Sequence, residues 1–175
     1  MVEYTIKQGI DRLSWRQAAA DLGVSPTTLV HHFGTKEQMV QTVLARLRER
    51  TFTDVEQRVG HRADLASAAR ASWERAADPE RWPETRLLFD VYAHALQEPH
   101  IYAEFLEHVI ADWKADLVLA QDGVPVHIAE REATLVIATI RGLLLDLLAT
   151  GDRERVAAAA EGFLAGLERA SASGT

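Results

Sequence analysis

The sequence predicts an all-α protein with an N-terminal helix-turn-helix domain followed by a C-terminal helical bundle. Three observations lead to this prediction. Apolar residues recur at helical spacing through most of the 175 residues, capping residues and helix breakers separate these segments, and no convincing strand pattern appears. We expect the two domains to be residues 1–46 and 47–175.

The first short helix of the predicted helix-turn-helix follows Ser14. Ser14 and Gln17 have the spacing of a capping box, in which two side chains satisfy backbone donors at a helix start. Ala18, Ala19 and Leu22 give this helix an apolar face. Gly23 stands where the chain leaves the helix, a position at which glycine adopts the left-handed conformation at low cost.

The second short helix starts at a serine followed by a proline. Ser25 suits the N-cap, and Pro26 suits the first helical position because the amide that proline lacks would have no partner there. Leu29 and Phe33 lie four residues apart and are expected to pack inward. The opposite face carries side chains that can form hydrogen bonds: Thr27, Thr28, His31 and His32.

A third helix begins directly afterwards, with Thr35 and Gln38 in a second capping box. Lys36 lies beside the positive end of this helix, where a lysine and exposed amides suit a phosphate group. A capping box or a pair of histidines is common on ordinary protein surfaces, but this order of caps, turn and short helices is typical of DNA-binding domains. We therefore expect contacts with double-stranded DNA from Ser25, Pro26, Thr27, Thr28, His31, His32 and Lys36.

Residues 9–44 resemble the DNA-binding region of the TetR family of transcriptional regulators. The matching positions are Gly9, Leu13, Ser14, Arg16, Ala19, Leu22, Gly23, Val24, Ser25, Thr28, Leu29, His32, Phe33, Thr35, Lys36, Glu37 and Met39. Val30 departs from the family pattern, which usually has a tyrosine that touches the DNA backbone, and Ala18 replaces a bulkier aliphatic residue. The family's first helix is normally longer than Met1–Gln8, so we expect a short or truncated first helix.

This resemblance implies a bacterial, cytoplasmic homodimer that binds a palindromic operator. It further implies a repressor that a small-molecule effector releases from DNA. A second hypothesis stays open because of Val30 and the short first helix. Under that hypothesis the protein is an all-α dimeric ligand-binding module that has lost specific operator binding.

The charge is unevenly distributed along the chain. Residues 1–50 contain seven lysines and arginines and five acidic residues, a charge of +2, which leaves −9 for the remainder because the total is −7. A mildly basic head on an acidic body suits a protein that touches DNA at one end. The modest positive charge predicts weak non-specific binding to DNA.

Several other functional classes lack support in the sequence. The absence of cysteine excludes disulfides and thiolate metal sites. The apolar stretch 133–149 is interrupted by Arg141 and Asp146 and is shorter than the roughly twenty residues that span a bilayer, so we expect no membrane segment. No catalytic or phosphate-binding motif appears, so we expect no enzyme activity, cofactor or metal; the pairs Asp90/His94 and His108/Asp112 are interpreted as solvated surface pairs.

The remaining helices are expected to form the body. Their predicted ranges are 36–53, 64–77, 83–98, 99–121, 127–149 and 153–170, with a connection over 54–62, a turn over 122–125 and a frayed end over 171–175. The family resemblance implies that the middle helices enclose an effector pocket. Its aromatic and apolar candidates, which suit an apolar or aromatic molecule, are Trp73, Leu88, Phe89, Tyr92, Phe105, His108 and Trp113.

The penultimate helix is apolar on nearly every side, so one stripe of it needs cover beyond its own core. A larger monomer core would supply that cover, but a symmetric four-helix interface between two chains is the favoured interpretation. The family resemblance also places the dimer interface on the last two helices. We expect it to include Leu135, Ile140, Leu143, Leu144, Leu147, Phe163 and Leu167.

Overall fold

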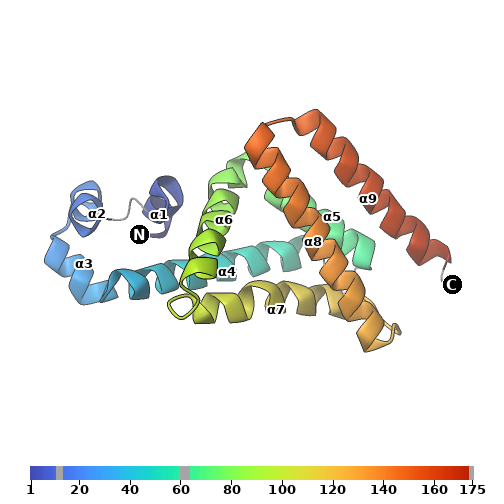
Figure 1. Cartoon of the computed structure of the whole chain (residues 1–175), viewed down its shortest axis with the longest axis horizontal. Helices are drawn as coiled ribbons and strands as arrows, with labels where there is room; N and C mark the ends of the chain where they lie inside the picture. Colours follow the sequence, from blue (N-terminus) through green and yellow to red (C-terminus); the bar gives the residue numbers. More distant parts are fainter. Residues whose placement is uncertain (11–13, 60–63, 174–175) are drawn as a thin grey trace. The chain divides into compact units, whose positions relative to one another are not determined.

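The computed structural model describes residues 1–10, 14–59 and 64–173, and the regular structure within these ranges is helical, without a strand. The elements are α1 (Val2–Gln8), α2 (Trp15–Leu22), α3 (Pro26–Phe33), α4 (Lys36–Val59), α5 (Leu65–Ala77), the 3-10 turn η1 (Pro79–Arg81), α6 (Trp82–Gln97), α7 (Ala103–Leu119), α8 (Val126–Thr150) and α9 (Arg153–Ser173) (Figure 1). The predicted all-α fold is confirmed.

Three predicted helix boundaries are wrong. Helix α4 continues to Val59, because no glycine or proline interrupts it before Gly60, whereas the sequence predicted a connection from residue 54. The predicted connection at residues 60–62 lies outside the described residues. Helix α7 begins at Ala103, after a turn in which the Ile101 amide donates to the Glu98 carbonyl at 3.0 Å. Helix α9 includes residues 171–173, which were expected to fray, and the rest of that prediction, residues 174–175, lies outside the described residues.

Contacts within the chain define two compact units. Unit 1 contains Met1–Phe52 and Pro83–His108, and unit 2 contains Thr53–Trp82 and Val109–Thr175. Unit 1 therefore joins the predicted head to most of α6, while unit 2 holds α5, η1, α8 and α9. The predicted domain boundary at residue 46 stays a prediction.

The core of unit 1 lies among α1, α2, α3, α4 and α6. Ala18 and Ala19 of α2 are each 1% exposed, so the neighbouring helices approach this helix closely. Leu29 of α3 and Met39 of α4 are buried in the same cluster. Helix α6 contributes its own face to that cluster through Leu87, Val91 and Ala95, which lie four residues apart. A helix that the sequence assigned to the body thus completes the core of the head.

One polar contact also joins α6 to the start of the chain. The Ile10 amide donates to the Asp90 carboxylate at 3.1 Å, and a Cβ on Gly9 would lie 3.4 Å from the same oxygen. Nδ1 of His94 donates a hydrogen bond to the Asp90 backbone carbonyl at 2.8 Å. Asp90 therefore accepts a hydrogen bond from the Ile10 amide, which follows α1 and has no partner within a helix.

Unit 2 is built on contacts among α5, α8 and α9. The buried side of α8 is formed by small and aliphatic residues: Ala129, Ala133, Val136, Ile137, Ile140, Leu144 and Leu147. Arg70 of α5 bridges to Glu161 and Glu168 of α9 at 2.9 Å each. At the turn between α8 and α9, Arg155 binds both carboxylate oxygens of Asp146 at 2.8 Å, which lowers the pKa of Asp146.

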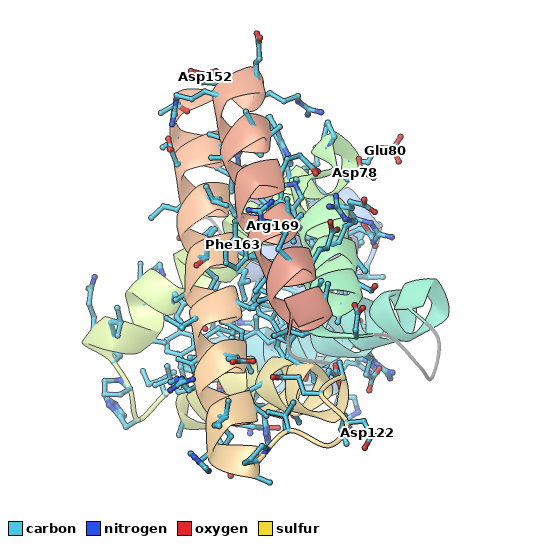
Figure 2. All side chains as sticks on the ribbon, turned by 90° about the vertical axis from the view of Figure 1, so that its right-hand side faces the viewer. Asp78, Glu80, Asp122, Asp152, Phe163 and Arg169 are labelled. Carbon is cyan, nitrogen blue, oxygen red and sulfur yellow. The ribbon has the colours of Figure 1, made fainter. Side chains whose placement is uncertain are left out.

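Helix α8 also carries an exposed apolar stripe opposite its buried side. We call its members the outer stripe: Leu135, Ala138, Gly142, Leu145 and Ala149, all exposed. Their alternating spacing of three and four residues keeps them on one narrow face. In Figure 2 the helices α8 and α9 face the viewer, with Asp152 and Asp122 at opposite ends of α8.

The two apolar sides together make α8 unusually hydrophobic. By length and composition alone it could cross a membrane, since an 18-residue window has a mean hydropathy of 1.7. A third of that window, 33%, is buried within the protein, and core helices of soluble proteins pass the same test. This helix alone is therefore weak evidence for a membrane span.

Replacement of Asp90 tests its contact with the Ile10 amide. We expect Asp90→Ala to lower the free energy of unfolding by about 1–3 kcal/mol, because it leaves a half-buried backbone donor without an acceptor. Asp90→Asn keeps an oxygen acceptor, so its free energy of unfolding should fall clearly less than that of Asp90→Ala. Urea denaturation of both variants checks this, and equal losses from Ala and Asn would show that the contact contributes nothing.

Candidate nucleic-acid interface

Helices α2 and α3 are joined by a tight turn at Gly23 and pack against each other. Gly23 has φ 68° and ψ 28°, the left-handed conformation predicted for it. Its amide and the Val24 amide donate to the carbonyls of Ala20 and Ala19 at 3.3 and 3.0 Å, which closes the end of α2. The turn therefore fixes where α3 starts.

The predicted capping box at the start of α2 is wrong. Ser14 is the N-cap residue, but its side chain forms no capping hydrogen bond. The Gln17 amide nitrogen instead donates to Asp21, one turn further along, at 3.0 Å. Leu22 is 42% exposed rather than packed inward, because the apolar face of α2 is narrow and is formed by Ala18 and Ala19.

The start of α3 agrees with the prediction. The Ser25 hydroxyl accepts a hydrogen bond from the Thr28 amide at 3.1 Å, and Pro26 occupies the first helical position. Leu29 is buried beneath the helix and Phe33 is half-buried. Helix α3 is thus held on one side and leaves the other side open to solvent.

The predicted DNA-contact residues are all exposed: Ser25, Pro26, Thr27, Thr28, His31, His32 and Lys36. Their local contacts separate them into two groups. The Thr28 hydroxyl lies 2.8 Å from the Ser25 hydroxyl, and the His32 ring packs edge-on against Phe33 at 4.6 Å. Thr27 and His31, one helical turn apart, form no comparable contact within the described residues, so their polar groups are available to a partner.

The predicted capping box at the start of α4 is present. The Thr35 amide donates to Gln38 at 2.9 Å, and the Gln38 amide donates to the Thr35 hydroxyl at 3.2 Å. The pKa of Glu37 is lowered by its own backbone amide and by Thr35. The side chains of Thr35 and Gln38 already occupy hydrogen-bonding groups at this helix end. Lys36 is therefore the group there that suits a phosphate, although the negative charge of Glu37 beside it opposes such an anion.

The outer face of α3 also carries an apolar side chain. Val30 is 45% exposed and lies beside Thr27, on the side away from His31. An exposed aliphatic group beside a hydrogen-bonding side chain can contact the methyl group of thymine in the major groove. The sequence pattern indicates for Val30 only the loss of a contact with the DNA backbone.

The predicted effector residues belong to both units. Leu88, Phe89, Tyr92, Phe105 and His108 lie in unit 1, where the rings of Tyr92 and Phe105 meet edge-on at 5.2 Å. Trp73 and Trp113 lie in unit 2. Trp73 is buried, and the Trp113 ring lies 5.5 Å from the Arg141 guanidinium. Whether these residues form one effector pocket stays a prediction.

The predicted dimer residues differ in their exposure. Leu135 is exposed, and Leu143, Phe163 and Leu167 are half-buried. Ile140, Leu144 and Leu147 are buried within their own protomer, so a partner does not reach them without local opening. Leu145 is 54% exposed but is absent from the predicted dimer residues, although its spacing from Leu135, Ala138 and Gly142 could have revealed it.

Metal ligands do not gather in the part of the chain that the structure describes. No group of three or more histidine, aspartate or glutamate side chains there could hold a metal ion. Asp90 and His94 do approach each other, with Nδ1 of His94 3.7 Å from the Asp90 carboxylate. That carboxylate accepts the Ile10 amide, so the pair has a structural role.

Comparisons with known proteins agree with this geometry. Residues 2–43 match the family model described as bacterial regulatory proteins, tetR family. The fold is similar to that of a crystallised transcriptional regulator from Rhodococcus sp. Rha1, with a TM-score of 0.80 and 24% sequence identity over 97% of this chain and 92% of that chain. No curated protein matches the sequence.

Proposed function

We propose that this chain is a DNA-binding regulator of the TetR family, whose model its residues 2–43 match, and that it acts as a homodimeric repressor. It binds a palindromic operator in the bacterial cytoplasm, and a small apolar or aromatic molecule releases it. The observation that carries this proposal is the outer face of α3, where Thr27 and His31 are exposed on a helix held rigidly from beneath.

The proposed DNA contacts follow from the two groups of residues on α3 and α4. Thr27 and His31 approach the base edges in the major groove, and Val30 contacts a thymine methyl group. Ser25, Thr28 and Lys36 contact the DNA backbone, which fixes the register of α3 without selecting a sequence. Pro26 and His32 flank these groups at the ends of the interface.

The proposal requires a dimer, because one eight-residue helix reads few base pairs. The outer stripe of α8 gives a second chain an apolar surface to cover. Exposed small residues on α9, Ala158, Ala159 and Gly162, allow another helix to approach closely. Two heads about one helical turn apart, ~34 Å, then read both halves of a palindrome.

A gel-shift assay of the full-length protein tests the proposed function. The DNA fragments are the regions upstream of its own gene and of the adjacent genes, with excess non-specific competitor. We expect a retarded band that survives the competitor and contains two chains per site or a multiple of two. If a folded dimer selects no site here or among fragments of the whole genome, the operator-free ligand-binding module becomes the better hypothesis.

Substitutions on α3 and α4 should separate base contacts from backbone contacts. We expect His31→Ala to change the preferred sequence, and Lys36→Ala to weaken binding to all sequences and reduce the salt slope by about one phosphate contact. Glu37→Gln is the control for Lys36→Ala, because it removes a negative charge at the neighbouring position. It should strengthen binding to all sequences, because that charge repels the DNA phosphates. Competition binding at several salt concentrations checks these effects, and an unchanged preference in His31→Ala would refute its role.

A charge placed on the outer stripe should prevent dimerisation. We expect Leu145→Asp to convert the dimer to a monomer and to abolish operator binding, since a buried unpaired carboxylate in an interface costs several kcal/mol. Leu119→Asp is the control, because Leu119 is 81% exposed and lies outside the stripe. Light scattering during size exclusion measures both, and a dimeric Leu145→Asp variant would contradict this interface.

A further inference from the structure

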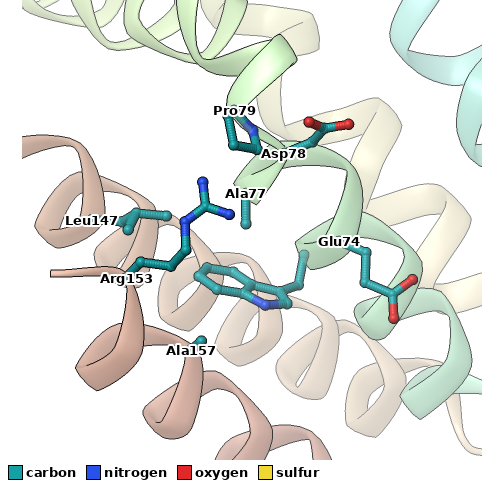
Figure 3. A pocket seen from close by; sticks show the side chains of 8 residues that line it. Glu74, Ala77, Asp78, Pro79, Leu147, Arg153 and Ala157 are labelled. Carbon is teal, nitrogen blue, oxygen red and sulfur yellow. The ribbon is translucent and has the colours of Figure 1, made fainter. Parts of the chain in front are cut away.

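Unit 2 contains a cavity of about 350 Å³ where the end of α5 and η1 meet the end of α8 and the start of α9 (Figure 3). Its walls are mainly apolar and come from Trp73, Ala77, Pro79, Leu147 and Ala157. Trp73 is only 6% exposed, so its ring is a fixed wall rather than a mobile surface group. The volume lies at the low end for small-molecule sites, which limits the ligand to a small one.

One cationic side chain enters this apolar cavity. Arg153, the first residue of α9, lines it, and its guanidinium lies 5.3 Å from the centre of the Trp82 ring. Trp82 is itself oriented, because its indole nitrogen donates to the Ala77 carbonyl at 3.1 Å. The aromatic ring therefore holds the guanidinium at the cavity without neutralising it.

Arg153 differs in this respect from its neighbour Arg155. The Arg155 guanidinium binds Asp146 through two hydrogen bonds of 2.8 Å and Asp152 through one of 3.0 Å. Within the residues that the structure describes, no carboxylate pairs with Arg153. Its planar fork of donors is thus available for a carboxylate from outside the chain.

Two carboxylates also line the cavity, but they are directed elsewhere. The Asp78 side chain accepts a hydrogen bond from the Glu80 amide at 3.0 Å, as the cap of η1. Figure 3 shows the carboxylates of Glu74 and Asp78 pointing away from Arg153. The charge directed into the cavity is therefore positive, although two acidic residues contribute to its walls.

We propose that this cavity binds a small aromatic monocarboxylate. The carboxylate of the ligand pairs with the Arg153 guanidinium, and its ring packs among Trp73, Pro79 and Leu147. Of the predicted effector residues, only Trp73 lines this cavity. The inference depends on contacts within unit 2 and not on operator binding. Its test is therefore independent of the test of the proposed repressor function.

Calorimetric titration of the full-length protein without DNA tests this proposal. The probes are benzoate, phenylacetate and 3-phenylpropionate, which differ in the distance between ring and carboxylate. Benzamide supplies a neutral ligand of the same shape as benzoate, and benzylamine supplies a cation. We expect at least one carboxylate to bind with a millimolar or lower Kd, and its amide to bind at least about tenfold more weakly, because it lacks the charge-assisted pair.

Four substitutions locate the binding to this cavity. We expect Arg153→Gln to weaken carboxylate binding at least about tenfold, whereas Arg131→Gln, an exposed arginine elsewhere on α8, leaves it unchanged. Ala157→Leu should abolish binding by filling the cavity without changing its charge. Glu74→Gln should leave the affinity equal or slightly higher, because the positive field at Arg153 is then less opposed. Circular dichroism confirms that each variant is folded.

Three results would overturn the proposal. The first is that none of the three carboxylates binds at millimolar concentration. The second is that carboxylate binding survives in both Arg153→Gln and Ala157→Leu, which would place the ligand elsewhere. The third is that benzylamine binds and Glu74→Gln weakens it, which would make this cavity a site for organic cations.

Discussion

Two helices of eight residues each cannot keep their shape alone in water, and the core beneath them is the constraint on which the proposed DNA interface depends. Both helices pack against that core through buried side chains, α2 through Ala18 and Ala19 and α3 through Leu29. Helix α6 completes it with Val91, which has no exposed surface, and adds the Asp90 carboxylate at the end of α1. The orientation of α3 therefore depends on residues far along the chain, so a movement of α6 would reach the outer face of α3 through packed side chains.

The apolar character of α8 has a comparable explanation in two opposite faces. One face packs within unit 2, while the outer stripe faces solvent in the single chain. A helix with both faces is apolar enough to resemble a membrane span. The proposed coverage by a second chain would explain the same composition without a membrane. The cavity of unit 2 lies where α8 ends and α9 begins. A ligand bound there would therefore contact the two helices that carry the proposed dimer interface.

Local sequence signals predicted the fold and the head well, because their energies come from neighbouring residues. The cap at Ser25, the turn at Gly23 and the capping box of Thr35 and Gln38 are of this kind. The same reasoning failed at Ser14, since the Gln17 side chain had an equally close alternative in Asp21. The contact between Ile10 and Asp90 spans 80 positions and leaves no local pattern, so the sequence did not indicate it.

Selection of binding sites from random DNA tests the central claim most directly, because a random pool offers the protein every candidate half-site at once. We expect the full-length protein to enrich an inverted repeat whose half-sites are centred about 10 base pairs apart or a multiple of that spacing, as two copies of α3 require. The His31→Ala variant should enrich a repeat that differs at the same position in both halves. Enrichment of no sequence by a folded dimer, or of a single asymmetric site, would contradict the account.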